Sequence, residues 1–296
     1  MEFFKRLMSR CILCGWSKKI FFLKSSCLLS LCVMLSSSAW AFEILTQGSA
    51  TEQLGYNNDD MKTNGEEALL KAYVKRGFQI FDVGANVGEW SSAALSSQPV
   101  LSIYAFEPIP AVYSVLSKNL ASKPVVTNNI AVSDREGSAT FFVYDQSLYD
   151  TKMSGFYDRP LLRNFLQPPT KTSVPTTTLD AFCMQQNVGS IDFLKIDTEG
   201  HESFVLRGAQ KLFQEQRVRA IQFEYGGCYQ DSQTTLKDVY RLLSEHGFLL
   251  FRICPQGLIF VPRWVDSLEN TTYSNYFAIL PRALPESWMT YLSKPT

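Results

Sequence analysis

A glycine turn between a predicted strand and a predicted helix is the most informative stretch of the chain. Residues 81–90 read FDVGANVGEW, so an apolar strand runs directly into glycines and then into a helix. Ligands of parallel α/β sheets bind at such strand ends, where glycine lets backbone segments approach closely. The spacing is G-x-N-x-G, not the G-x-G-x-x-G that packs a pyrophosphate, and Asn86 supplies both hydrogen-bond donors and acceptors. The turn therefore favours a ligand with an amino-acid head, whose carboxylate and ammonium need both donors and acceptors.

Two later strand ends offer groups that suit a nucleoside. Glu107 lies in YAFEP (104–108), roughly 20 residues after the turn, where an acid accepts hydrogen bonds from both ribose hydroxyls. That feature alone fits NAD equally well. The next strand ends in NNIAVS (128–133), and we predict that Asn129 and Ala131 contact the adenine edge. Turn chemistry explains an asparagine-rich strand exit equally well.

The first catalytic candidates end the predicted buried strand IDFLKID, residues 191–197. Side chains alternate along a strand, so Lys195 and Asp197 lie on one face. A buried lysine needs a partner, and we therefore expect an ion pair between the two. The pair is either purely structural or part of the site at this strand end.

TEGHE (198–202) follows and opens a helix, whose dipole stabilises carboxylates and lowers the pKa of a histidine. A neutral His201 can accept a proton, and so can Asp197 and Glu199. An exposed first-turn histidine is the alternative interpretation of His201.

Metal binding is the less favoured reading of these acids. Asp197, Glu199 and Glu224 could hold a divalent cation, because hard cations need clustered oxygens. The following strand lacks a paired Asp-Asn, so we predict no metal. Aromatic residues either shape an acceptor pocket or cover the sheet edge; they lie in YGGCY (225–229) and at Tyr149, Phe156 and Tyr157.

Strand and helix patterns alternate along the body of the chain, which predicts a doubly wound, mostly parallel α/β sheet. After a helix that begins at Glu66, strands are expected at 78–83, 101–106, 125–131, 191–197, 218–225, 247–253, 258–261 and 275–280. Helices are expected at 88–96, 110–120, 178–187, 202–213 and 233–245. Residues 138–144 are also β-like, and 145–172 form a polar insertion.

Five segments taken in order resemble the FkbM-type methyltransferases, a branch of the class I S-adenosylmethionine-dependent enzymes that mostly methylate hydroxyl oxygens. They are DVGANVGEWS, YAFEP, NNIAVSDREG, TTTLD and FLKIDTEGHE. The resemblance covers roughly residues 66–281 and is specific as a set. It implies a Rossmann-like sheet of seven strands with one late antiparallel strand. It also implies S-adenosylmethionine as cofactor, in a site formed by Asp82, Gly84, Asn86, Gly88 and Glu107.

The resemblance predicts O-methylation of a small molecule, sugar or glycan, with N-methylation as the nearest variant. A catalytically silent, exported binding protein with the same fold is one alternative. An NAD-dependent oxidoreductase is the other; Asn86 and the absence of a Tyr-x-x-x-Lys set argue against it.

The N-terminal stretch is typical of an export signal. Basic residues precede the short apolar run SSCLLSLCVML (25–35), and small residues allow cleavage after Ala41. We therefore expect a signal peptide or membrane anchor at 1–41, with organelle import or a cytoplasmic location as alternatives. A lead-in segment (42–65), the methyltransferase domain (66–285) and a C-terminal tail (286–296) are expected to follow.

Composition limits the partners. Lys plus Arg and Asp plus Glu each total 28, so no net basic field gathers nucleic-acid phosphates. We expect no nucleic-acid partner, and membrane association only through the N-terminal segment. Cys183, Cys228 and Cys254 of the body are expected to be buried thiols that act as small hydrophobic residues.

Overall fold

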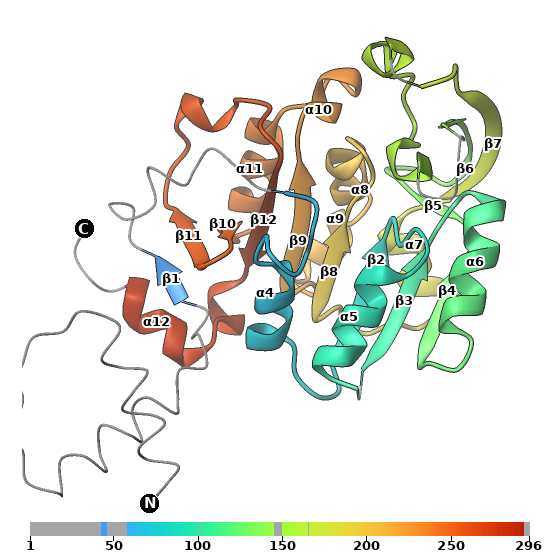
Figure 1. The fold of residues 1–296 in the computed structure, drawn as a ribbon. Coiled ribbons are helices and arrows are strands. Elements are labelled where there is room, and N and C mark those ends of the chain that lie inside the picture. Colours follow the sequence, from blue (N-terminus) through green and yellow to red (C-terminus); the bar gives the residue numbers. More distant parts are fainter. Residues whose placement is uncertain (1–42, 46–57, 100, 145–149, 165, 293–296) are drawn as a thin grey trace, which may run out of the picture. The chain divides into compact units, whose positions relative to one another are not determined.

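The computed structural model describes residues 43–45, 58–99, 101–144, 150–164 and 166–292 (Figure 1). The chain divides between Ala41 and Phe42 into two units, and every described residue belongs to the second. The predicted signal peptide or anchor and Tyr149 lie outside the described residues. Within these described ranges, no helix is long and apolar enough to cross a membrane.

A sheet of nine strands forms the centre of the described part of the chain, in the order β1-β11-β10-β12-β9-β8-β2-β3-β4. Every residue of the central strands β8, β9 and β12 is buried, as expected when helices cover both faces of a sheet. The strands are β1 Glu43–Leu45, β2 Gln79–Val83, β3 Ser102–Phe106, β4 Val125–Asn128, β8 Phe193–Ile196, β9 Ala220–Tyr225, β10 Leu249–Cys254, β11 Gly257–Val261 and β12 Ser274–Ile279.

The strand directions confirm the predicted doubly wound arrangement. β2, β3, β4, β8 and β9 run parallel, and β12 lies antiparallel between β9 and β10. The predicted number of seven strands is too small, because β11 and β1 extend the edge beside β10. Only Pro255 and Gln256 separate β10 from β11, so this short connection folds back as a hairpin.

A second, three-stranded sheet has the order β5-β7-β6. Its strands are β5 Ala131–Val132, β6 Gly137–Val143 and β7 Thr170–Thr177. The prediction of one strand over 125–131 is therefore wrong in its second half. The Asn128 amide donates hydrogen bonds to the carbonyls of Ala105 and Val126, and such local bonds compete with a continuing ladder. The predicted insertion 145–172 is also too long, because β7 begins at Thr170.

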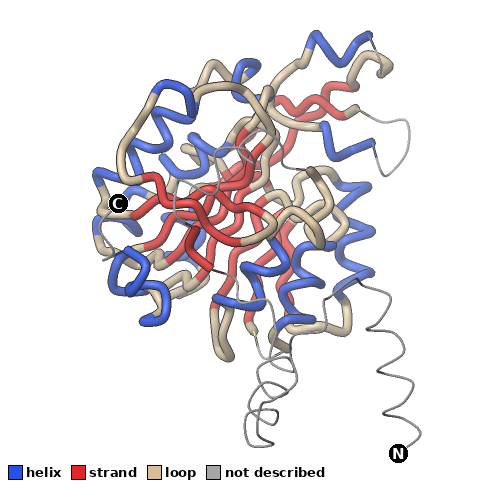
Figure 2. Tube along the Cα trace, turned by 60° about the vertical axis from the view of Figure 1, so that its left-hand side comes forward, coloured by secondary structure: helices blue, strands red, loops and turns tan. Residues whose placement is uncertain are grey.

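Helices cover both faces of the large sheet (Figure 2). Successive side chains of a strand point to opposite faces, so Ile80 packs with α4 and α5 whereas Phe81 packs with α7, α8 and α9. The α-helices are α4 Glu66–Tyr73, α5 Glu89–Ser97, α6 Pro110–Leu120, α7 Leu179–Gln185, α8 Glu202–Arg207, α9 Gln210–Gln214, α10 Cys228–Asp231, α11 Leu236–Glu245 and α12 Glu286–Leu292. Short 3-10 helices are η2 Asp150–Met153, η3 Pro160–Asn164, η4 Asp266–Leu268 and η5 Pro281–Ala283.

One predicted helix is divided in the structure, and the expected C-terminal tail contains a helix. The helix expected at 202–213 breaks into α8 and α9 around Gly208, where a Cβ atom would lie 2.1 Å from the carbonyl oxygen of Ser133. The expected C-terminal tail begins with α12, because Trp288 is an apolar anchor. Its ring lies 6.1 Å from Tyr73 and 6.3 Å from Phe277, and it is buried between them and the sheet.

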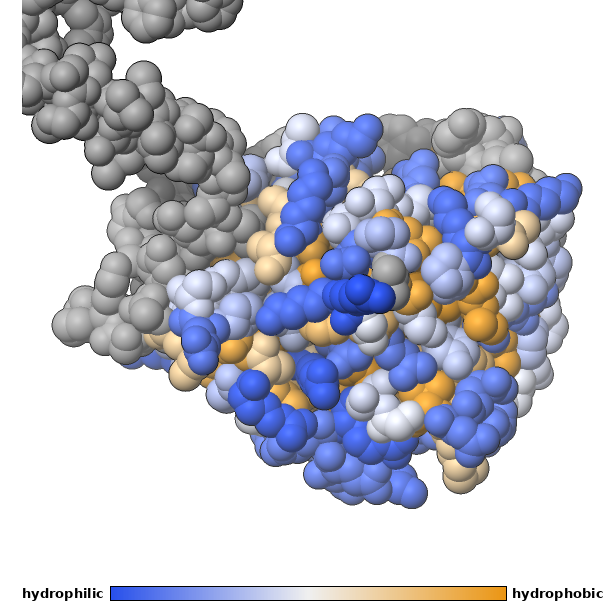
Figure 3. Space-filling model, turned by 90° about the horizontal axis from the view of Figure 1, so that it is seen from below, coloured by the Kyte–Doolittle hydropathy of each residue, from blue (hydrophilic) through white to orange (hydrophobic). Residues whose placement is uncertain are grey.

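On the face seen from below the view of Figure 1, hydrophilic and hydrophobic residues are interspersed (Figure 3). The exposed large hydrophobic residues lie on separate elements, among them Leu161 in η3 and Met184 in α7. Such a scatter is ordinary for a protein surface.

Candidate active site

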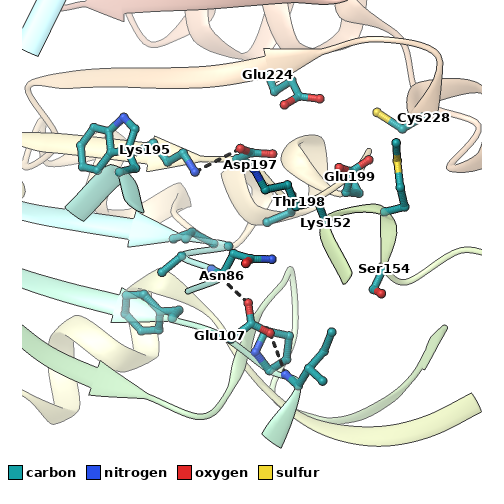
Figure 4. Close-up of a pocket in the computed structure, with 18 of the residues that line it drawn as sticks. Asn86, Glu107, Lys152, Ser154, Lys195, Asp197, Thr198, Glu199, Glu224 and Cys228 are labelled. Atoms are coloured by element: carbon teal, nitrogen blue, oxygen red, sulfur yellow. Dashed lines mark hydrogen bonds and ion pairs between the residues drawn. The ribbon is translucent and has the colours of Figure 1, made fainter. Parts of the chain in front are cut away.

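A cavity of about 370 Å³ lies where the parallel strands of the large sheet end (Figure 4). Residues that follow directly after four strands line it. They are Gly84 after β2, Glu107 after β3, Asp197 after β8 and Gly226 after β9. The topology therefore gathers at one edge the groups that the sequence placed at separate strand ends.

The two glycines of the first turn allow other segments of the protein to approach closely. Gly84 has φ +79°, and a Cβ atom there would lie 1.8 Å from the carbonyl oxygen of Asp197. Gly88 has φ +90°, and its Cβ atom would meet Leu116 and Leu120 of α6 at 3.0–3.2 Å. Gly84 lines the cavity and Gly88 does not, so Gly88 is a packing residue at the start of α5.

Glu107 is held in a fixed orientation. Its Oε2 accepts a hydrogen bond from the backbone N–H of Asn86 at 3.1 Å, and its Oε1 accepts one from Ile109 at 2.8 Å. Burial raises the pKa of Glu107 to about 7. Each oxygen retains a lone pair, because a carboxylate has about four acceptor positions. Glu107 and Asn86 therefore present one polar rim to the cavity.

Asp82 lies behind the cavity wall. Its side chain is completely buried, and its Oδ2 accepts a 2.6 Å hydrogen bond from Ser91. The Lys195 ammonium lies 3.6 Å from Asp82 and 3.1 Å from Asp197, which confirms the expected contact between Lys195 and Asp197. Asp82 is absent from the lining and Lys195 is part of it, so Asp82 is connected to the cavity through its ion pair with Lys195. Burial raises the pKa of Asp82.

Several acids stabilise the charge of Lys195. Burial alone would lower its pKa, but Asp197, Asp82 and Glu66 together raise that pKa above its ordinary value. Glu66 comes from α4 and accepts hydrogen bonds from the amides of Asn64, Gln222 and Asn275. It also lines the cavity. Sequence reasoning missed Glu66, because an acid in the first turn of a helix is ordinary.

Of the two residues predicted to contact adenine after β4, only Ala131 reaches the cavity. The amide of Asn129 donates hydrogen bonds to the carbonyls of Glu107 and Pro108 at 2.9 and 3.0 Å. It is not part of the cavity lining, whereas Ile130 and Ala131 are. Asn129 therefore fixes the loop that carries Glu107, and Ala131 contributes an apolar wall.

His201 does not reach the cavity. Its Nε2 lies 2.9 Å from the Ser133 hydroxyl and its Nδ1 lies 2.7 Å from the Tyr157 hydroxyl. Its ring is stacked on Phe156 and Phe204, with centroids 3.7 and 4.6 Å away. Burial lowers its pKa to about 3. Burial, and not the helix dipole invoked from the sequence, favours the neutral form of His201, and its position makes it a packing residue and not a base at this site.

We expect His201→Gln to alter the pH dependence of stability. The folded pKa is about 3 and the unfolded value is about 6.5, so below pH 6.5 only the unfolded chain gains this proton. The wild type therefore loses about 2 kcal/mol from this group between pH 7.5 and 5. Urea unfolding at both pH values measures the free energy of unfolding of each protein. The advantage of the wild type over the variant should be smaller at pH 5 than at pH 7.5 by that amount. A gap that stays constant would mean that folded His201 titrates normally.

The segment between β6 and β7 forms another side of the cavity. Met153, Phe156 and Arg159 line it, and Tyr157 is turned away toward His201. Arg159 forms a 2.6 Å ion pair with Glu199 and a 3.3 Å ion pair with Asp231. The predicted contribution of the insertion to the pocket therefore comes from residues other than Tyr157.

Three acids cluster at the ends of β8 and β9. Asp197, Glu199 and Glu224 all line the cavity, next to the Cys228 thiol (Figure 4). Burial raises the pKa of Glu199 to about 8 against the opposing effect of Arg159. Burial, followed by the negative charges of Asp197 and Glu199, raises the pKa of Glu224 well above its ordinary value. This end of the cavity therefore accepts protons or cations readily.

The sheet order, the antiparallel β12 between β9 and β10, and the strand-end cavity with Glu107 define the fold and binding edge of class I methyltransferases. Residues 82–250 match the profile described as the methyltransferase FkbM domain. The match spans more than half of the chain, which therefore belongs to the FkbM family and is an S-adenosylmethionine-dependent methyltransferase.

Two curated proteins are similar to this chain. The 31-O-demethyl-FK506 methyltransferase FkbM of Streptomyces tacrolimicus is 27% identical over 209 residues, which cover 60% of this chain and 77% of that protein. The 2-O-methyltransferase NoeI of Sinorhizobium fredii (strain NBRC 101917 / NGR234) is 26% identical over 188 residues, with coverages of 60% and 75%. Among solved structures, the precorrin-6y C5,15-methyltransferase of Geobacter metallireducens GS-15 is 12% identical, covers 77% of this chain and 95% of that chain, and has a TM-score of 0.41.

Proposed function

We propose that this protein transfers the methyl group of S-adenosylmethionine to a hydroxyl oxygen of a small molecule, sugar or glycan. The observation that carries the proposal is the group of carboxylates at the ends of β8 and β9. A hydroxyl must lose its proton when its oxygen takes a methyl group, and Asp197 and Glu199 offer carboxylate oxygens on the cavity wall. The two curated relatives, both named for O-methylation, support the same acceptor atom.

The donor side of the cavity suits this cofactor. S-adenosylmethionine supplies an electrophilic methyl group on a positively charged sulfur. Seven acids and three bases line the cavity, which favours a cationic ligand. Glu107 would accept hydrogen bonds from the ribose hydroxyls, Ile109 and Ala131 would pack on the adenine, and Asn86 would contact the amino-acid head. The lining acids are Asp59, Glu66, Glu89, Glu107, Asp197, Glu199 and Glu224, and the bases are Lys152, Arg159 and Lys195.

Charge also narrows the acceptor. Burial raises the pKa of four lining acids, but even when these are protonated the other three acids balance the three basic residues, so the lining does not attract phosphates or carboxylates. An uncharged polyol or a cationic amino compound therefore suits the cavity better than an anion. This argument, with the balanced net charge of the chain, keeps nucleic acid outside our proposal.

Replacing Glu107 should weaken donor binding. In Glu107→Gln the amide nitrogen faces the N–H group of Asn86 or Ile109, so one fixed hydrogen bond is lost. We expect calorimetry at pH 8 to give a Kd for S-adenosylmethionine about 10 to 100-fold higher. In the wild type, protonation of Glu107, with its pKa of about 7, should weaken binding about tenfold between pH 8 and 6. The variant should lack this pH-dependent part; equal pH dependence in both proteins would contradict the assignment.

The acceptor atom can be tested with the full-length protein. A labelled methyl donor is incubated with panels of sugars, phenols, aliphatic alcohols and amines, and each product is analysed by mass spectrometry and NMR. We expect the label on oxygen. A product methylated on nitrogen or carbon would overturn the proposal while leaving the methyltransferase assignment intact. Glu107→Gln is the donor-site control, because Asp82 lies behind the wall and its loss would affect folding first.

We further propose that residues 1–41 direct export or anchor the protein to a membrane. The proposal rests on the basic residues, the apolar run and the small residues before Phe42. N-terminal sequencing of the protein from fractionated cells tests it. A mature chain that begins at Phe42 supports cleavage, and an intact chain in the soluble fraction contradicts export and anchoring alike.

A further inference from the structure

Three side chains from different elements surround one space at the β8 and β9 end of the cavity. Glu199 follows β8, Glu224 is in β9 and Cys228 begins α10. One carboxylate oxygen from each acid and the Sγ atom of Cys228 all lie within 4.8 Å of one another. Figure 4 shows the three side chains together on the side of the cavity away from Glu107.

Glu224 gives an independent reason to expect a ligand there. Glu224 is only 9% exposed. Among the described residues, no N–H group donates a hydrogen bond to its carboxyl group. Its hydrogen-bonding neighbour is Asp197, which is another acid. Buried carboxylates are normally paired or bind a metal, and a bound cation would take the place of the proton that Glu224 and Asp197 share.

The charges around Glu224 are mostly negative. Asp197, Glu199 and Glu202 all interact electrostatically with its carboxyl group. The nearby cations are already engaged, since Lys195 pairs with Asp82 and Asp197. Arg159 pairs with Glu199 and Asp231.

We infer that Glu199, Glu224 and Cys228 form a binding site for one divalent transition-metal ion of borderline softness, such as Zn²⁺ or Co²⁺. Two carboxylates with one thiolate match the ligands of such ions, whereas Mg²⁺ and Ca²⁺ take oxygen alone. Tetrahedral coordination needs an oxygen-to-sulfur separation of about 3.6 Å, so the side chains close by at most about 1 Å on binding. The 2.6 Å bond from Arg159 uses one oxygen of Glu199 and orients the other.

Three protein ligands leave a fourth position that faces the cavity, as in catalytic zinc sites. A hydroxyl that binds there loses its proton more readily. Asp197 receives that proton, the hydroxyl oxygen gains the methyl group, and the donor leaves as its neutral thioether. This use of the open position rests on the proposed O-methylation, but the binding of the ion does not.

The sequence analysis predicted no metal because the strand that follows these acids lacks a paired Asp-Asn. Cys228 was interpreted as a buried small residue, and only the loop after β9 brings its sulfur next to the two acids.

Cobalt binding tests the site, because a thiolate ligand gives Co²⁺ a charge-transfer absorption band. Every protein is full length and carries Cys11→Ser, Cys14→Ser, Cys27→Ser and Cys32→Ser, so that N-terminal thiols do not contribute. We expect one Co²⁺ per chain with the band. Adding Cys228→Ser should abolish the band, and adding Glu224→Gln should weaken binding at least about tenfold. Cys183→Ser, which removes a buried thiol of α7, should leave both unchanged.

The inference is overturned if Co²⁺ and Zn²⁺ do not bind, or if the band survives in Cys228→Ser. X-ray absorption of the Zn²⁺-loaded protein without site substitutions decides the matter if a variant fails to fold. One sulfur with oxygen neighbours supports the site, and a shell without sulfur contradicts it. Calorimetry with S-adenosylmethionine is run in parallel, so that failure of the metal site is distinguished from failure of donor binding.

Discussion

Lys195→Met is expected to lower the free energy of unfolding by about 3 to 5 kcal/mol near neutral pH, because it leaves buried carboxylates without a counter-charge. The Lys195 side chain is 6% exposed, and its ammonium lies between Asp82 and Asp197. The loss should shrink as the pH falls, since protonated carboxyl groups no longer need the ammonium. Chemical denaturation of the full-length protein at pH 5 and pH 8 measures both effects.

Lys152→Met is the matched control for this prediction. The Lys152 side chain is 51% exposed and pairs with the exposed Glu89 at 3.4 Å, so its loss should change stability by less than about 1 kcal/mol. Adding Asp82→Asn to Lys195→Met should recover part of the stability, because it removes a buried carboxylate that no longer has a positive partner. If Lys195→Met is as stable as Lys152→Met, the ammonium is not the centre of a buried ionic group.

Gly84→Ala should destabilise the protein by at least about 3 kcal/mol, the sum of a left-handed backbone and severe overpacking. The new Cβ atom would lie 1.8 Å from the carbonyl oxygen of Asp197, so the ends of β2 and β8 must separate. Donor affinity should fall as well, because Gly84 and Asp197 line the same cavity. Thermal unfolding and calorimetry with S-adenosylmethionine measure the two losses.

Gly77→Ala separates the effect of the backbone from the effect of the contact. Gly77 has φ +82°, close to the φ +79° of Gly84, but no atom lies within 4 Å of its added Cβ atom. It should cost only about 1 to 2 kcal/mol. Similar losses at the two positions would show that the strand contact at Gly84 tolerates a methyl group.

The sequence predicted the order and type of most elements, because apolar periodicity records which faces are buried. The helix 110–120 matches α6 Pro110–Leu120, and the late antiparallel strand lies where it was expected. Edge pairing was missed: β1 comes from the expected lead-in segment and pairs with β11 far along the chain. Nothing in a three-residue strand identifies such a distant partner.

Side-chain direction was harder to predict than strand position. Glu107 and Asp197 follow their strands and line the cavity, as expected from the meeting of strand ends at one edge. Asp82, Asn129 and His201 are near that edge but point into hydrogen-bonded interiors. Polar residues beside a site either contact the ligand or hold those that do, and residue type and spacing are the same in both cases.

The small sheet β5-β7-β6 has a consequence for the choice of acceptor. One wall of the catalytic chamber is carried by the segment that connects β6 to β7, while Glu107 and Asn86 follow strands of the large sheet. Under the proposed function, exchanging residues of that connecting segment would change the methyl recipient without altering the strands that hold the nucleoside. Such a division would allow one scaffold to serve different acceptors.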